Sequence, residues 1–151
     1  MTSKPYTIGS YRVSVVRDGA TPYEDATVST PREIAGLLRR YIPTDDPREH
    51  FVLAALNVRH RVIGLHTVSI GCLTSSIVHP REVFRPAILM GAAAVVVAHN
   101  HPSGDPEPSA EDLSLTRRLA SAGTLLGIQV LDHVILGGEE RFVSLKERGV
   151  V

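Results

Sequence analysis

The sequence has little cysteine, few aromatic residues and no excess of charge of one sign. Its one cysteine, Cys72, excludes a disulfide framework and any zinc site built from several thiolates, and we expect it to be a small buried hydrophobe. Lys+Arg and Asp+Glu number 16 each, so the formal net charge is zero. Because proteins that grip phosphate backbones carry clustered basic residues in excess, this balance argues against direct nucleic-acid binding.

Long apolar runs are also absent from the sequence. The first ten residues lack the apolar stretch of a signal peptide, and the longest apolar run, around residues 92–98, is far shorter than a membrane span. We therefore expect a cytoplasmic protein that does not associate with membranes. The chain has 151 residues, of which 43% are hydrophobic and 5% aromatic, so we expect one domain with an aliphatic core.

Residue patterning predicts alternating strands and helices. Apolar and polar residues alternate over Tyr11–Arg17, which predicts a strand. Ser29 or Thr30 is expected to cap a helix that has Pro31 in its first turn and ends near Tyr41. Further strands are expected over residues 51–56, 61–70, 92–98, 128–136 and 142–145, and helices over 80–90 and 109–126. This order indicates an α/β fold with a mixed β-sheet flanked by helices.

The segment that carries chemistry follows the strand predicted over residues 92–98, whose small and β-branched side chains favour burial on both faces. His99 and His101 are two residues apart, so their side chains point the same way from an extended backbone. Asp112 begins the next helix, and a proline-rich loop could bring it back to the strand end. Two imidazoles and one carboxylate leave a fourth tetrahedral position open, which is typical of a catalytic zinc site.

Asp112 also has a purely structural interpretation. In Ser109-x-x-Asp112 the serine could cap the helix while the aspartate interacts with the helix dipole. Two acids of the loop, Asp105 and Glu107, are alternatives to Asp112 as the third metal ligand.

Three further polar residues have expected structural roles. Asn100, between the two histidines, is expected to point away from them and to brace the loop. Asp132 and His133 lie in an apolar strand, so one of them is expected to face inward, either to orient a metal ligand or to make a core hydrogen bond.

The motifs of several other enzyme classes are absent from the sequence. The chain contains no Pro-Cys-x-x-Cys, His-Glu-x-x-His, phosphate-binding Gly-x-x-x-x-Gly-Lys or Gly-x-Ser-x-Gly motif.

His99-x-His101, seven residues, and then Ser109-x-x-Asp112 is similar to the JAMM signature of MPN/JAB-domain metalloproteins. The stretches PREV at 80–83, HNHPSG at 99–104 and DH at 132–133 resemble the RadC branch of that family. The resemblance covers about residues 47–149, roughly two-thirds of the chain. It implies a single MPN/JAB domain with a cytidine-deaminase-like layered α/β fold, and a zinc ion held by His99, His101 and Asp112.

In the catalytic branches this resemblance implies hydrolysis of peptide or isopeptide amide bonds by a metal-activated water, with a glutamate as the general base. Glu49, directly before the strand predicted over 51–56, is the preferred candidate, and its structural alternative is an exposed acid at a strand edge. Glu82 is the second candidate, although an acid in a first helical turn is also favoured by the helix dipole. The Ser109 hydroxyl is expected to stabilise the developing oxyanion.

Longer RadC-like proteins carry an upstream helix-hairpin-helix module, and residues 1–46 are too short for one. We therefore expect a stand-alone domain, in which residues 1–46 supply an N-terminal strand and helix packed on the core. The sequence predicts a zinc-dependent hydrolase of an unidentified peptide or protein. A DNA-repair-associated accessory protein and a metal-binding interaction scaffold without turnover remain as alternatives.

Overall fold

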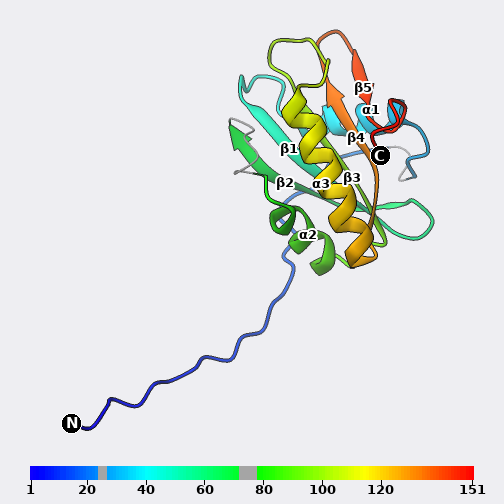
Figure 1. Ribbon diagram of the computed structural model, residues 1–151. Coiled ribbons are helices and arrows are strands. Elements are labelled where there is room, and N and C mark those ends of the chain that lie inside the picture. Colours follow the sequence, from blue (N-terminus) through cyan, green and yellow to red (C-terminus); the bar gives the residue numbers. More distant parts are fainter. Residues whose placement is uncertain (24–26, 72–77) are drawn as a thin grey trace.

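The computed structural model describes residues 1–23, 27–71 and 78–151 (Figure 1). Cys72, with its expected burial, lies outside the described residues. The elements follow one another as α1 (Pro31–Tyr41), β1 (Glu49–Leu56), β2 (Val62–Gly71), α2 (Pro80–Leu89), β3 (Ala94–Asn100), α3 (Ala110–Leu126), β4 (Gln129–Leu136) and β5 (Phe142–Ser144). From α1 onward this is the order that the residue patterning predicts, so the α/β prediction is confirmed.

The five strands form one mixed sheet in the order β2-β1-β3-β4-β5. β3 and β4 are parallel and are joined by α3, whereas the other neighbouring pairs are antiparallel. β1 and β2 form a hairpin whose turn is closed by the Asn57 amide, which donates to the Arg61 carbonyl at 3.0 Å. Because β1 and β3 are antiparallel, the start of β1 lies beside the end of β3, with Phe51 opposite His99.

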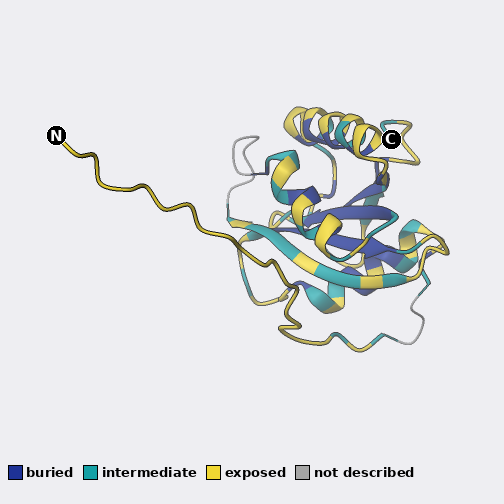
Figure 2. Ribbon diagram, turned by 90° about the horizontal axis from the view of Figure 1, so that it is seen from below, coloured by how far each residue is buried: buried dark blue, intermediate teal, exposed yellow. Residues whose placement is uncertain are grey.

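Helices cover both faces of the sheet, with α1 on one face and α2 and α3 on the other (Figures 1 and 2). Six residues of β3, from Ala94 to His99, are buried, as the small and β-branched composition predicts. The aliphatic side chains on the α1 face are buried together, and they include Leu37, Leu38, Val52, Val96 and Val134. The buried apolar side chains on the other face include Leu53, Phe84, Val97, Leu115 and Leu119.

α1 and α3 begin where their predicted capping residues, Thr30 and Ser109, lie. In α1 the Thr30 hydroxyl accepts from the Glu33 amide, and the Glu33 carboxylate accepts from the Thr30 amide in return. α3 ends at Gly127, which takes a left-handed conformation with φ 71° that favours glycine. Among the described residues, none of these helices combines the length and the apolar character needed to cross a bilayer.

The strand predicted over Tyr11–Arg17 is wrong. This segment forms no strand with any described part of the chain, and it extends away from the domain (Figures 1 and 2). Tyr11 is 90% exposed and Val13 is 70% exposed, so the apolar side of the alternation faces solvent. Alternation shows which face of a strand would be buried, but a strand also needs a partner for its backbone hydrogen bonds. The expected N-terminal helix, by contrast, does pack on the core as α1.

Candidate metal centre

The structure brings His99, His101 and Asp112 together at the end of β3. His99 Nε2 lies 2.9 Å from His101 Nε2 and 3.3 Å from Asp112 Oδ1, and His101 Nε2 lies 3.3 Å from Asp112 Oδ2. Three ligand atoms at tetrahedral angles, each about 2.0–2.1 Å from a zinc ion, would lie about 3.3 Å from one another. The donor set and its spacing therefore fit a divalent metal such as zinc, and these residues could hold one.

Backbone structure explains why the two histidines converge. His99 lies in β3, and the His101 amide extends the pairing with β4 by donating to the Leu136 carbonyl at 2.8 Å. The chain then turns away at Gly104, whose φ of 86° favours glycine. His101 Nδ1 lies 2.8 Å from the Asp105 carbonyl. A carbonyl only accepts, so Nδ1 always carries a proton: in the neutral ring Nε2 has its lone pair facing the site, and in the protonated ring Nε2 donates to Asp112.

Asp112 combines both roles that its spacing suggests. Its backbone amide donates to the Ser109 hydroxyl at 3.1 Å, and its Oδ2 accepts from the Ser109 amide at 2.9 Å, so the two residues form a capping box for α3. The same carboxylate faces both histidines. The cap thus fixes the orientation of the candidate ligand.

The two alternative acids lie elsewhere. The Asp105 carboxylate accepts from the Glu107 amide at 3.0 Å, and the Glu107 carboxylate pairs with Arg148 at 2.8 Å. Neither belongs to the group of metal-ligand atoms that the described residues bring together.

Protonation in the metal-free site follows from the short contacts. The hydrogen bond with Asp112 raises the pKa of His101, although partial burial opposes that shift. Burial alone would raise the pKa of Asp112, but the neighbouring imidazoles of His101 and His99, together with the Ser109 amide, outweigh it and lower this pKa far below its usual range. Asp112 is therefore ionised at neutral pH, as a metal ligand must be.

Behind His99 lies a fully buried polar cluster. His133 Nε2 is 2.8 Å from His99 Nδ1, and His133 Nδ1 is 2.6 Å from the hydroxyl of Thr116. Phe51 stacks on the His99 ring with its centroid 6.0 Å away, and it meets the His133 ring edge-on. Burial holds the pKa of His133 well below its usual range, and the charge of His99 acts in the same direction.

Asp132 and His133 are both buried, although only one of them was expected to face inward. The reason is that helices or loops cover both faces of the sheet at β4, which also carries an irregularity between Val130 and Asp132 in its pairing with β3. Asp132 accepts from the Ser144 hydroxyl at 2.7 Å and from the Lys146 amide at 3.0 Å. It therefore fastens β4 to the C-terminal turn, while His133 contacts the candidate ligand.

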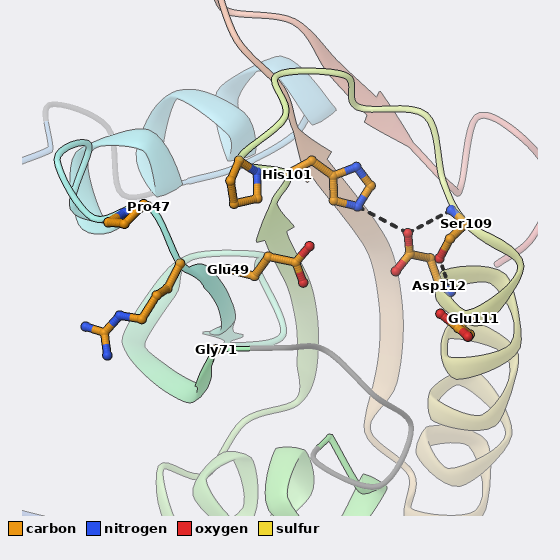
Figure 3. Close-up of a pocket in the computed structure, with 9 residues that line it drawn as sticks. Pro47, Glu49, Gly71, His101, Ser109, Glu111 and Asp112 are labelled. Atoms are coloured by element: carbon orange, nitrogen blue, oxygen red, sulfur yellow. Dashed lines mark hydrogen bonds and ion pairs between the residues drawn. The ribbon is translucent and has the colours of Figure 1, made fainter.

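A pocket of about 450 Å³ opens in front of the candidate ligands and is lined in part by Glu49, Ser109, Glu111 and Asp112. Figure 3 shows the Glu49 carboxylate pointing into the space that the His101 ring and the Asp112 carboxylate also face. Glu49 reaches it because it is the first residue of β1, the strand next to β3.

Glu82, the second candidate for the base, has a different environment. It lies in the first turn of α2, where its carboxylate pairs with Arg81 and Arg85 at 3.3 Å. It does not line the pocket beside the candidate ligands.

Asn100 braces β1, not the loop as expected. Its Oδ1 accepts from the His50 amide at 2.7 Å, and its Nδ2 donates to the Arg48 carbonyl at 3.1 Å. These two backbone groups flank Glu49. The end of β3 and the residue that follows it therefore carry two candidate ligands and, between them, a side chain that holds the candidate base in place.

Thr116 is a further residue of the centre, and no role was predicted for it. It lies four residues after Asp112, which places both on one face of α3, and this spacing is the sequence signal that could have identified it. Its hydroxyl donates to the Asp112 carbonyl at 2.6 Å.

Comparison with known proteins agrees with this geometry. The family model of the RadC-like JAB domain matches residues 28–150. The chain belongs to the RadC-like JAB domain family. UPF0758 proteins are similar to it: that of Rubrobacter xylanophilus is 52% identical over 140 residues, which are 93% of this chain and 59% of the relative. That of Moorella thermoacetica is 52% identical over 127 residues, 82% of this chain and 53% of the relative.

This JAB domain thus spans about half the length of the curated relatives that it matches. The UPF0758 protein of Geobacillus thermodenitrificans, for example, is 56% identical over 104 residues, which make up 69% of this chain and 46% of the relative. Membership of the family agrees with the single-domain α/β architecture, in which the end of β3 and the first turn of α3 bring the candidate metal ligands together.

Proposed function

We propose that this JAB domain is a zinc-dependent hydrolase that cleaves a peptide or isopeptide amide bond. The observation that carries the proposal is the convergence of His99, His101 and Asp112 at the wall of an open pocket that also contains the Glu49 carboxylate. Two imidazoles and one carboxylate leave a tetrahedral zinc with an open position, as in zinc hydrolases. A purely structural zinc site would instead have its coordination completed by protein side chains.

His99, His101 and Asp112 would hold the zinc. When bound, zinc lowers the pKa of a coordinated water to about 7 and polarises a carbonyl oxygen. Glu49 acts as the general base, because its carboxylate faces the same space as the ligands. It accepts a proton from the attacking water and then delivers that proton to the leaving amine.

Ser109 stabilises the charge that develops on the carbonyl oxygen. Its hydroxyl oxygen already accepts a hydrogen bond from the Asp112 amide, and this leaves the hydroxyl proton free to donate into the pocket. The capping box therefore orients a ligand and an oxyanion donor with the same pair of residues.

The proposal is tested with zinc-loaded protein and a library of short peptides and of peptides linked through a lysine side chain, with cleavage followed by mass spectrometry. We expect wild type to cleave at least one class, and Glu49→Gln to retain one zinc per chain but lose cleavage. Glu111→Gln is the matched control, because Glu111 is an acid that also lines the pocket but does not belong to the group of candidate metal ligands. This variant should keep both zinc and cleavage.

Two results would contradict the proposal. Full cleavage by Glu49→Gln would remove Glu49 from the mechanism. Stoichiometric zinc without cleavage of any probe would replace the hydrolase with a metal-binding protein that lacks turnover.

A further inference from the structure

We infer that Thr116 and His133 form a hydrogen-bond relay that sets the tautomer of His99, so that its Nε2 is free of a proton and ready to bind metal. The inference deepens the proposed function and rests on its metal-binding part only. It makes Thr116 and His133 positioning residues, which act on the metal through His99.

The direction of the relay follows from the group at its end. Thr116 has one hydroxyl proton, which it donates to the Asp112 carbonyl at 2.6 Å. In its 2.6 Å contact with His133 Nδ1 the hydroxyl oxygen is then the acceptor, so His133 Nδ1 carries a proton. The neutral His133 ring is left with a lone pair on Nε2.

That lone pair decides the state of His99. His133 Nε2 accepts from His99 Nδ1 across 2.8 Å, so the proton of the neutral His99 ring lies on Nδ1. His99 Nε2, which faces His101 and Asp112, is consequently bare. The neutral His101 ring has the same tautomer, because the Asp105 carbonyl accepts from its Nδ1, and only the protonated ring carries an Nε2 proton that it can share with His99 Nε2 at 2.9 Å.

Because the three residues are buried, their mutual hydrogen bonds alone determine where the ring protons lie. His99, Thr116 and His133 are all 0% exposed, and Phe51 packs against both rings. Water therefore cannot form hydrogen bonds with His99 Nδ1 or with the two ring nitrogens of His133, so the neighbouring side chains determine which of these nitrogens is protonated.

Thr116→Val should reverse the relay while preserving the shape of the side chain. Without the hydroxyl, a proton on His133 Nδ1 would be buried without an acceptor, so the ring shifts its proton to Nε2 and donates to His99 Nδ1. The His99 proton then lies on Nε2, in the position that the metal needs. The number of protons on the two rings is unchanged.

The test has two readouts that need no substrate. Nitrogen-15 NMR of the histidine rings in metal-free protein, in mildly alkaline buffer, reports which ring nitrogen carries the proton. We expect the Nδ1–H tautomer for His99 in wild type and in Thr116→Ser, and the Nε2–H tautomer in Thr116→Val. Zinc affinity, measured by competition with a chelator, should fall about tenfold to a hundredfold in Thr116→Val and return to the wild-type value in Thr116→Ser.

Thr124→Val is the matched control. Thr124 donates to the carbonyl four residues earlier on the same helix, as Thr116 does, but it is exposed and contacts no histidine in the described structure. This variant should leave the His99 tautomer and zinc affinity unchanged. The relay is overturned if metal-free wild type shows His99 protonated on Nε2, or if Thr116→Val keeps the wild-type tautomer and affinity. Neither readout depends on hydrolysis, so absent cleavage would contradict the hydrolase without touching the relay.

Discussion

Removing the Asn100 side chain should loosen the start of β1 and displace Glu49. The side chain makes two hydrogen bonds to backbone, one to the His50 amide at 2.7 Å and one to the Arg48 carbonyl at 3.1 Å. Each such bond contributes about 1 kcal/mol to stability, so Asn100→Ala should lose about 2 kcal/mol of unfolding free energy. Urea unfolding of the metal-free protein measures this loss.

Asn57→Ala is the control for Asn100→Ala. Asn57 Oδ1 accepts from the Arg59 amide at 2.9 Å and from the Arg61 amide at 3.0 Å, in the turn at the other end of β1. Amide hydrogen exchange should show faster exchange of the His50 N–H in Asn100→Ala only. If Asn100→Ala unfolds within about 0.5 kcal/mol of wild type and His50 exchanges as before, Asn100 does not position this strand.

Three further predictions concern the first turn of α3 and the charges of the site. Ser109→Ala should lower the free energy of unfolding by about 1 kcal/mol and weaken zinc binding. Thr30→Ala removes the equivalent cap of α1, so it should lower stability by a similar amount but leave zinc affinity unchanged. Equal zinc affinities of the two variants would contradict the role of the α3 cap in orienting Asp112. In metal-free protein the raised pKa of His101 adds stability that is fully present below pH 6.5, and this stability is lost as the pH rises through the raised pKa. The lowered pKa of Asp112 adds stability that is fully present above pH 3.8, and this stability is lost as the pH falls into the acid range. Urea unfolding at a series of pH values should therefore show the largest contribution of His101 and Asp112 to stability between pH 3.8 and 6.5. Asp112→Asn should abolish this contribution, and a stability profile that the substitution leaves unchanged would refute the pairing. Zinc affinity should rise with pH above 6.5 because His101 must lose its proton to bind.

Local patterns were sufficient for most of the fold. The composition of β3 and the capping residues of α1 and α3 act within a few residues, so their positions can be read from the sequence. The convergence of His99 and His101 has the same origin, because alternation along one strand places them together. Tyr11–Arg17 shows the limit of such patterns, since its alternation has no neighbouring strand among the described residues.

Contacts between separate strands and helices could be identified only from the structure. Glu49 reaches the candidate ligands only because β1 lies beside β3 with Phe51 opposite His99. The contact between His133 and His99 likewise depends on the parallel pairing of β3 with β4. No spacing within one element fixes either register, so the contacts of Asn100 with the start of β1 and of His133 with His99 could not be derived from local sequence.

Metal binding by His99, His101 and Asp112 is the central claim, and zinc titration of the chelator-treated protein tests it most directly. The account predicts one zinc per chain, and near-complete loss of this binding in His101→Asn and Asp112→Asn while both variants stay folded by circular dichroism. Cobalt substituted for zinc should give the visible absorption of a tetrahedral site with nitrogen and oxygen ligands. Failure of the folded wild type to bind a stoichiometric metal ion, or binding that survives both substitutions, would contradict it.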